Sequence, residues 1–251
     1  MTEQELYLFD LQGYITVPNA LNAAQLKDLN RLVDGQLAEH AKPDERMVRF
    51  DRSLLTWGAA FRELIDPATI TPYLEQLIGR GFRLDHDYCD VIRGGANRHS
   101  GTLHGGGTPF DSCMFFKHHD GRMYNGLLVV AYNLHDVNPG DGGFVCVPGS
   151  HKSNYALPES WRDLGTPREC IRAVPGPAGT AIIFTEALTH GTLPWAGKHE
   201  RRTAFYKYSP PSISWHAKYY DPSKYTDLTD RQRAILEAPN ARYGWRVAGT
   251  M

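Results

Sequence analysis

Two of the eleven histidines occupy positions from which they could bind a metal ion. His104 lies where a glycine-rich loop enters an apolar stretch, and His190 follows an apolar run and precedes Gly191. At the rim of a β-barrel each imidazole could project into the mouth, and imidazole nitrogen is a common metal ligand. A histidine near a strand end is more often hydrogen-bonded or exposed, so this pattern alone leaves metal binding open.

Hydrolytic chemistry has little support. The chain contains no HExxH motif and no cluster of Cys and His residues, which argues against a zinc hydrolase or a structural zinc site. Ser150 and His151 are neighbours, but adjacent side chains of a strand point to opposite faces, so the two are poorly placed to act together. We expect His151 to be structural or to lie at the rim of a pocket.

The stretch 132–152 is the element around which such a site would be built. Residues 127–132 form a nearly unbroken apolar run, as expected of a strand that is buried on both faces. The sequence NPGDGG at 138–143 can form a tight reversal, and residues 144–147 return as a second apolar run. The pattern predicts a buried β-hairpin.

Helical patterns precede this stretch and strand patterns surround it. Apolar residues at helical spacing after Asn22 predict an amphipathic helix over 23–38. The sequence also predicts helices at 57–65 and 71–79, a hairpin tip at 118–121, a helix that begins at Thr229, and strands at 82–92, 110–117, 123–134, 180–185 and 201–208. We expect one domain, 1–251, with an N-terminal helical layer over about 1–80, a barrel core over about 82–210 and a C-terminal helical extension.

Composition and charge argue against several classes of function. The net charge of −1 gives no field that would favour nucleic-acid polymers or an anionic membrane surface. The four cysteines form no CxxC pair, and no secretory signal or membrane-spanning apolar run is present. We expect a cytoplasmic protein that acts on a small molecule, and nothing in the sequence predicts its oligomeric state.

Three segments carry a family resemblance: FDLQGY at 9–14, GGFVCVPGSHK at 142–152, and HG at 190–191 followed by RR at 201–202. Together they resemble the phytanoyl-CoA dioxygenase family of iron(II)- and 2-oxoglutarate-dependent oxygenases, over about residues 6–210. The resemblance implies a mainly β fold with flanking helices, the double-stranded β-helix also called a jelly roll or cupin-like barrel. It further implies iron at the mouth of the barrel with 2-oxoglutarate beside it.

The resemblance also assigns residues. It makes His104 and His190 the metal ligands, and it makes Arg201 the partner of the distal carboxylate of 2-oxoglutarate, a bidentate match. Thr192 is a weaker candidate for a hydroxyl contact to the cosubstrate. Alternation along the strand places Arg201 and Arg202 on opposite faces, and only the family spacing favours Arg201 as the one that points inward.

The carboxylate ligand is where the chain departs from the family, which normally has His-x-Asp. If His104 is the first ligand, the aspartate position is Gly106. The rival His118-His119-Asp120 fits His-x-Asp literally, but it has the features of an exposed hairpin tip and lies closer in sequence to His190 than the family usually shows.

Related iron halogenases carry glycine or alanine at that position, because a missing carboxylate leaves room and charge for chloride. Gly106 therefore predicts a halide site, and the chain is expected to use Fe(II), 2-oxoglutarate, O2 and chloride to chlorinate an aliphatic carbon of a small metabolite. Charged residues near the expected mouth would suit an anionic, nucleotide-like substrate; they are Arg93, Arg98, His99 and Lys117. The alternatives are a hydroxylase whose third ligand is Asp120, Asp111 or water, and a binding module without chemistry.

Overall fold

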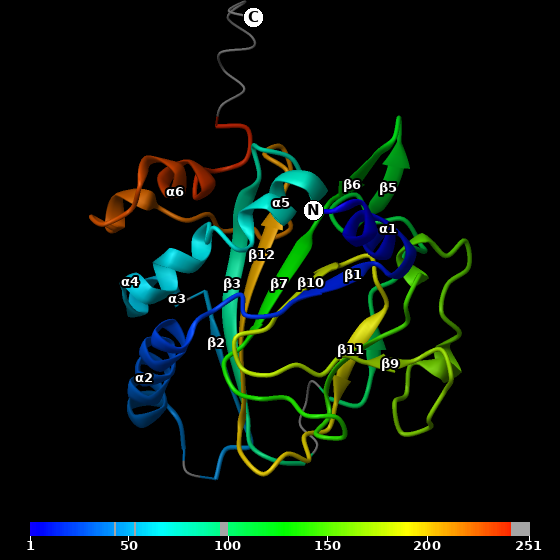
Figure 1. The fold of residues 1–251 in the computed structure, drawn as a ribbon, viewed down its shortest axis with the longest axis horizontal. Helices are drawn as coiled ribbons and strands as arrows, with labels where there is room; N and C mark the ends of the chain where they lie inside the picture. Colours follow the sequence, from blue (N-terminus) through cyan, green and yellow to red (C-terminus); the bar gives the residue numbers. More distant parts are fainter. Residues whose placement is uncertain (43, 53, 96–99, 242–251) are drawn as a thin grey trace, which may run out of the picture.

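Two antiparallel sheets form the centre of the computed structural model, which describes residues 1–42, 44–52, 54–95 and 100–241 (Figure 1). The strands of the larger sheet, in spatial order, are β1 (Tyr14–Val17), β10 (Ala181–Thr185), β7 (Leu128–Asn133), β12 (Arg201–Ser209), β3 (Arg83–Ile92) and β2 (Met47–Asp51). Those of the smaller sheet are β4 (Leu103–His104), β11 (His190–Leu193), β8 (Gly143–Cys146) and β9 (Arg172–Ala173). A separate hairpin consists of β5 (Phe116–His119) and β6 (Arg122–Asn125).

From β3 onward the chain alternates between the two sheets, apart from the β5–β6 hairpin and β9, which stays beside β8. From β3 the chain passes to β4 in the smaller sheet, and after the β5–β6 hairpin it continues through β7 and β8 and then through β10, β11 and β12 in the same alternating way. The expected hairpin of 127–147 is therefore wrong: β7 pairs with β10 and β12, whereas β8 pairs with β11 and β9. Because both edges of β7 are occupied, residues 134–142 cross to the other sheet instead of returning alongside it.

The strand alternation places one apolar core between the sheets and another outside the larger one. Val129 and Ala131 of β7 face the smaller sheet, where they join Phe144 and Phe205. The intervening residues of β7 face the helices; they are Leu128, Val130 and Tyr132. Burying each large apolar side chain contributes roughly 1.5–3 kcal/mol, so the inner core holds the two sheets together and the outer core holds the helices against the larger sheet.

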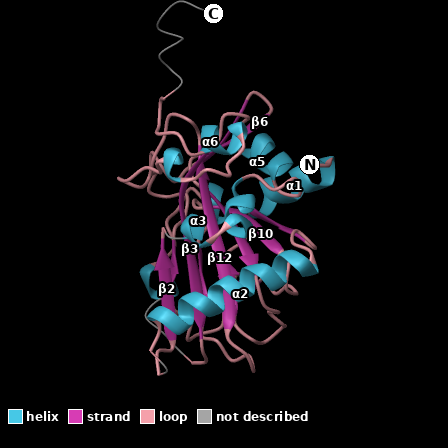
Figure 2. Ribbon diagram, turned by 90° about the vertical axis from the view of Figure 1, so that its left-hand side faces the viewer, coloured by secondary structure: helices cyan, strands magenta, loops and turns pink. Residues whose placement is uncertain are grey.

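Helices cover the outer face of the larger sheet, and Figure 2 shows α2 lying across its strands. Asn22 caps α2 through a capping box with Gln25, as predicted. The helices are α1 (Glu3–Gln12), α2 (Ala23–His40), α3 (Leu54–Trp57), α4 (Ala59–Arg62), α5 (Thr71–Leu77) and α6 (Asp230–Ile235), with short 3-10 turns η1 (Glu63–Ile65), η2 (Ser150–Lys152), η3 (Glu159–Trp161) and η4 (Pro222–Lys224).

Two local expectations need correction. The N-terminal part, expected as a helical layer, also contributes strand β2 to the larger sheet. The expected strand at 110–117 begins only at Phe116, because the carboxylate of Asp111 accepts the backbone N–H groups of Cys113 and Met114 and so forms a turn. None of the helices in the described ranges combines the length and apolarity that a bilayer span requires.

Candidate active site

The two predicted histidines lie side by side. His104 on β4 and His190 on β11 are direct antiparallel partners, and their ring centroids are 4.2 Å apart. The Nδ1 atom of His190 lies 2.7 Å from the carbonyl oxygen of Leu188. When Nδ1–H donates to that carbonyl, the ring is held in one orientation and Nε2 is left available as a metal ligand.

The surroundings keep both imidazoles neutral, which is the form that binds metal. The neighbouring His190, followed by burial, lowers the pKa of His104 to about 3. Burial also lowers the pKa of His190. Neither ring needs to lose a proton near neutral pH before it can act as a ligand.

A cavity of about 460 Å³ opens in front of this pair, between β2, β3, β11 and β12. Segment 213–216, which follows β12, closes one side of it. Besides the two histidines, the cavity is lined by residues that include Arg49, Asp51, Arg52, His86, Tyr88, Asp90, Thr192, Arg201, Phe205, Lys207, Trp215 and His216.

Arg201 points into this cavity and Arg202 points away from it. Arg201 is 4% exposed, and its Nε has no hydrogen-bond partner among the described residues. Burial lowers the pKa of Arg201, although Asp90 opposes the shift. Arg202 lies on the opposite face, where it pairs with Glu200 and Asp34. A buried, unpaired guanidinium calls for an anion, and Thr192 lines the same cavity.

The donor set fits an iron ion held by two histidines. Within the described ranges, no three His, Cys, Asp or Glu side chains come together as a metal site. His104 and His190 supply two imidazoles, and the unpaired Arg201 in the same cavity suits a chelating carboxylate. No described residue supplies the third protein ligand of the usual two-histidine, one-carboxylate arrangement.

Gly106 is turned toward a neighbouring cavity, of about 490 Å³, that Thr189 and Ser150 also line. Its φ is +116°, and a Cβ atom there would lie 3.1 Å from Oγ1 of Thr189. At Gly105, whose φ is +75°, a Cβ would lie 2.7 Å from the Leu188 carbonyl oxygen. The backbone of this turn therefore requires glycine at both positions, whatever ligand the histidines hold.

The rival ligands lie elsewhere. His118 and Asp120 are exposed on the β5–β6 hairpin, with Asp120 in the left-handed region at φ +48°. His118 lines a different cavity, together with Asp10 and Lys152. The structure does not bring this pair together with His190.

The charged residues expected at the mouth are dispersed. Arg93 pairs with Glu200, and Lys117 is exposed on the β5–β6 hairpin. Arg98 and His99 lie outside the described residues. The basis for a nucleotide-like substrate is correspondingly weaker.

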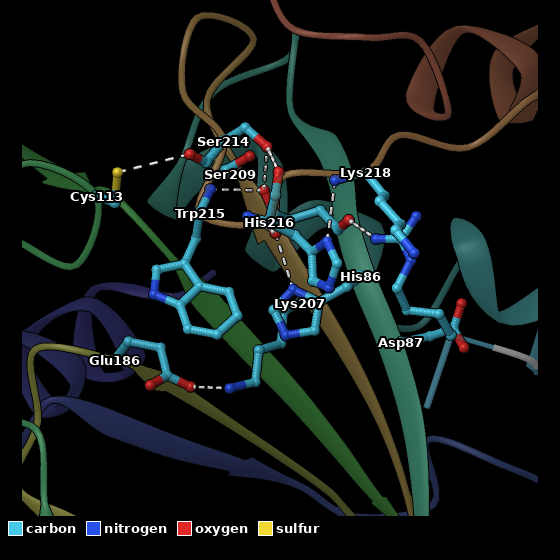
Figure 3. Close-up of polar contacts among 12 residues, drawn as sticks. His86, Asp87, Cys113, Glu186, Lys207, Ser209, Ser214, Trp215, His216 and Lys218 are labelled. Atoms are coloured by element: carbon cyan, nitrogen blue, oxygen red, sulfur yellow. Dashed lines mark hydrogen bonds and ion pairs between the residues drawn. The ribbon is translucent and has the colours of Figure 1, made fainter. Parts of the chain in front are cut away.

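Several cavity residues were missed by sequence reasoning. Lys207 of β12 extends to Glu186, and Figure 3 shows this pair beside the ring of Trp215. Alternation along β3 and β12 could have placed His86 and Lys207 on the cavity face, because the same period that assigns Arg201 includes Lys207. No local signal marks segment 213–216 as a wall of the cavity.

Comparison with known proteins identifies the fold. The family model described as phytanoyl-CoA dioxygenase (PhyH) matches residues 104–203. The structure of HygX from Streptomyces hygroscopicus with nickel and 2-oxoglutarate bound superposes with a TM-score of 0.76 at 23% identity, covering 85% of this chain and 89% of HygX. No curated protein sequence matches the chain significantly.

Two structures from nogalamycin biosynthesis are also similar. The α-ketoglutarate-dependent epimerase SnoN gives a TM-score of 0.59 at 19% identity, covering 84% of this chain and 83% of SnoN. The α-ketoglutarate-dependent carbocyclase SnoK gives a TM-score of 0.60 at 17% identity, covering 84% of this chain and 85% of SnoK. At these identities the similarity establishes the fold, and the expected jelly roll is confirmed.

Proposed function

With the match of residues 104–203 to the phytanoyl-CoA dioxygenase family as the premise, we propose that this chain is an iron(II)- and 2-oxoglutarate-dependent enzyme that attacks an aliphatic C–H bond of a small metabolite. The observation that carries the proposal is the pairing of two neutral histidines with a buried, unpaired arginine in one cavity. The HygX structures hold nickel or iron, and 2-oxoglutarate, in the same fold.

Each residue has a distinct task in this proposal. His104 and His190 hold the iron, with the His190 ring fixed by the Leu188 carbonyl. Arg201 pairs with the distal carboxylate of 2-oxoglutarate, and the buried setting strengthens that pair by excluding water. Thr192 lines the same cavity, and its hydroxyl would donate to the same cosubstrate. The bound iron, with 2-oxoglutarate and O2, supplies the oxidising power that removes a hydrogen atom from the substrate carbon.

Halogenation is the outcome that we propose first. Among the described residues the two histidines have no third protein donor beside them, which would leave a coordination position for an exogenous anion, and chloride has the required charge and size. Chloride bound there would be transferred to the substrate carbon in place of hydroxide.

Hydroxylation is the second candidate, and the geometry of Gly106 favours it. The positive φ of this residue and the direction of its absent Cβ explain the glycine without reference to a halide. Water would then fill the third position, and oxygen would be transferred to the substrate.

An anaerobic titration separates these outcomes. Iron(II) and 2-oxoglutarate are added to the protein with and without chloride, and the absorption of the metal site is recorded. Binding of both with a chloride-dependent change supports the halogenase, and binding without that change supports the hydroxylase. Failure to bind either one would leave only a binding module.

Gly106→Asp and Gly106→Ala form a matched pair for the same experiment. Both substitutions impose the positive-φ strain, a cost of about 1–3 kcal/mol, but only aspartate adds a carboxylate. Loss of the chloride effect in Gly106→Asp with its retention in Gly106→Ala is the result expected of a halide site. An equal loss in both variants would mean that Gly106 serves only the turn.

A further inference from the structure

Two cations that line the cavity, Arg49 and Lys207, are each neutralised by a buried carboxylate. Arg49 donates to Asp90 through Nε and Nη2 at 2.7 and 2.6 Å, a bidentate ion pair between β2 and β3. Lys207 pairs with Glu186 at 2.5 Å. Each cation is thus matched by a carboxylate before any ligand arrives.

The pair of Lys207 and Glu186 stays charged although it is buried. Burial disfavours the ammonium of Lys207, but the attraction of Glu186 outweighs it and raises the pKa of Lys207. Burial likewise disfavours the carboxylate of Glu186, but Lys207 and then His190 lower its pKa to about 2. A phosphate beside Lys207 would place further negative charge next to the buried Glu186 carboxylate, which is costly, whereas a neutral hydroxyl can accept from a remaining N–H of Lys207 with the ion pair intact.

The remaining charges are already committed or balanced. In the proposed function Arg201 is taken by 2-oxoglutarate. Arg52 at the rim donates to the backbone oxygen of Asp85 and lies over the Tyr220 ring at 4.7 Å, and its neighbour Asp51 is an exposed carboxylate. Arg52 forms no ion pair among the described residues. The remaining cations Arg49, Arg52 and Lys207 are nevertheless equalled in number by the carboxylates of Asp51, Asp90 and Glu186. The described wall therefore carries no net positive charge for a phosphate, whose recognition normally relies on an excess of arginine or lysine donors.

One wall of the cavity is a ladder of nearly parallel rings. Phe205 stacks on Tyr88 at 4.5 Å and 16°, and His86 follows Tyr88 at 6.3 Å and 19°. Trp215 completes the ladder at 5.1 Å and 28° from His86, and it is 50% exposed. An aromatic wall that ends in a half-exposed indole offers a surface for a ring, and Lys207 beside it carries N–H donors beyond the one used by Glu186.

From these observations we infer that the organic substrate is an uncharged ring compound bearing hydroxyl groups, such as a sugar or cyclitol unit, and that nucleotides and coenzyme A esters are excluded. The ring packs along Trp215, and its oxygens accept from Lys207. This inference rests on the proposed function, because it takes Arg201 to be occupied by 2-oxoglutarate.

Paired probes test the inference on the full chain loaded with nickel(II) and 2-oxoglutarate. Binding of these two is measured first, and its failure would refute the proposed function alone. Calorimetric titration then compares methyl β-glucoside with glucose 6-phosphate, and adenosine with AMP. We expect each neutral probe to bind at least about tenfold more tightly than its phosphate, a difference of about 1.4 kcal/mol. Tighter binding of either phosphate would overturn the inference, and so would a failure of both neutral probes to bind.

Variants test the paired charges and the aromatic wall of the cavity separately. Asp90→Asn unpairs Arg49 and should improve phosphate binding about tenfold, whereas Asp120→Asn makes the same charge change on the exposed β5–β6 hairpin, outside this cavity, and should not. Trp215→Ala should weaken the neutral probes about tenfold, and Trp161→Ala, which removes a comparably exposed indole outside this cavity, should not. Equal effects of the two aspartate variants would contradict the role of the paired charges, and equal effects of the two tryptophan variants would contradict the role of the aromatic wall. The comparison of probes on the wild-type protein holds even if a variant fails to fold.

Discussion

Adjacent arginines on one strand show how strongly a single residue's environment decides its role. Arg201 is buried in the cavity with an unpaired Nε, whereas Arg202 ends in an ion-pair network with Glu200 and Asp34. The same side chain is therefore a candidate ligand site at one position and a structural cross-link to α2 at the next.

Exchanging each arginine for alanine should separate these roles. Arg201→Ala should weaken 2-oxoglutarate binding by about 2–5 kcal/mol, because the cosubstrate carboxylate is left desolvated and unpaired. Arg202→Ala should instead lower the free energy of unfolding and leave cosubstrate affinity nearly unchanged. Calorimetric titration and urea unfolding of both variants measure the two effects, and an equal loss of affinity would show that the cavity does not hold 2-oxoglutarate at Arg201.

The histidine pair makes a second prediction at this scale. His104→Ala and His190→Ala should each abolish stoichiometric iron binding, because a single imidazole does not fix the metal. His118→Ala, on the exposed hairpin, is the control and should bind iron normally. Metal content after anaerobic loading and gel filtration is the measurement, and normal loading of His104→Ala would contradict the assignment.

At the scale of elements, the turn 147–153 joins the two segments that carry the histidines. The hydroxyl of Ser150 accepts the N–H of Thr189, next to His190, and its carbonyl accepts the N–H of Gly107, near His104. The following residue, His151, is buried, and its Nε2 lies 3.0 Å from the backbone oxygen of Asp10, at the end of α1. The PGSHK motif is thus a structural junction, as expected for His151.

The stability of this junction should depend on pH. Burial lowers the pKa of His151 to about 4, whereas an unfolded histidine titrates near 6.5. Between these values the unfolded chain binds more protons, so stability is complete above pH 6.5 and falls as the pH drops toward 4, by up to about 3 kcal/mol.

Urea unfolding of the iron-free protein at pH 7.5 and 5.0 measures this effect. His151→Gln should lose part of the pH dependence, and the part that remains includes that of His104, His190 and His216, whose pKa values are also lowered and which are present in both proteins. Identical pH dependence in the variant would show that His151 is protonated without cost in the folded state.

Sequence reasoning located elements better than it located their partners. The capped helix after Asn22 and the strand that contains Arg201 were predicted because local periodicity and capping specify them. The pairing of β7 and β8 was wrong because an apolar run shows only that a strand is buried, and not which sheet buries it. Trp215 was missed because its position depends on hydrogen bonds to Asp85, far away in sequence.

At the scale of the whole molecule, the segment after β12 closes the cavity through contacts with β3. The carboxylate of Asp85, which is fully buried, accepts the backbone N–H groups of Trp215 and His216 at 3.0 and 3.1 Å, and also the hydroxyl of Ser214. It pairs with Arg83 on the same strand. One buried carboxylate thus determines where the cavity wall stands.

Removing this charge should both destabilise the protein and open the cavity. Asp85→Asn leaves Arg83 buried without its counter-ion, a loss of about 3 kcal/mol in the free energy of unfolding, and it replaces an acceptor by a donor facing the N–H groups. Substrate affinity should fall with Trp215 displaced, while iron binding persists. Urea unfolding and metal loading measure both, with Asp221→Asn, an exposed cap in the same segment, as the control. Unchanged stability would contradict this role of Asp85.

The alternation of strands between the two sheets also determines when the site can come into existence. His104 finds its partner on β11, and Arg201 is held between β3 and β7, so these pairings join parts of the chain that are made far apart in time. Contacts of long sequence separation form late, and a domain folds as a unit once it has emerged during synthesis. A nascent chain whose β12 has not yet emerged therefore lacks the complete site, and an iron ion held as proposed would be acquired only after synthesis of β12.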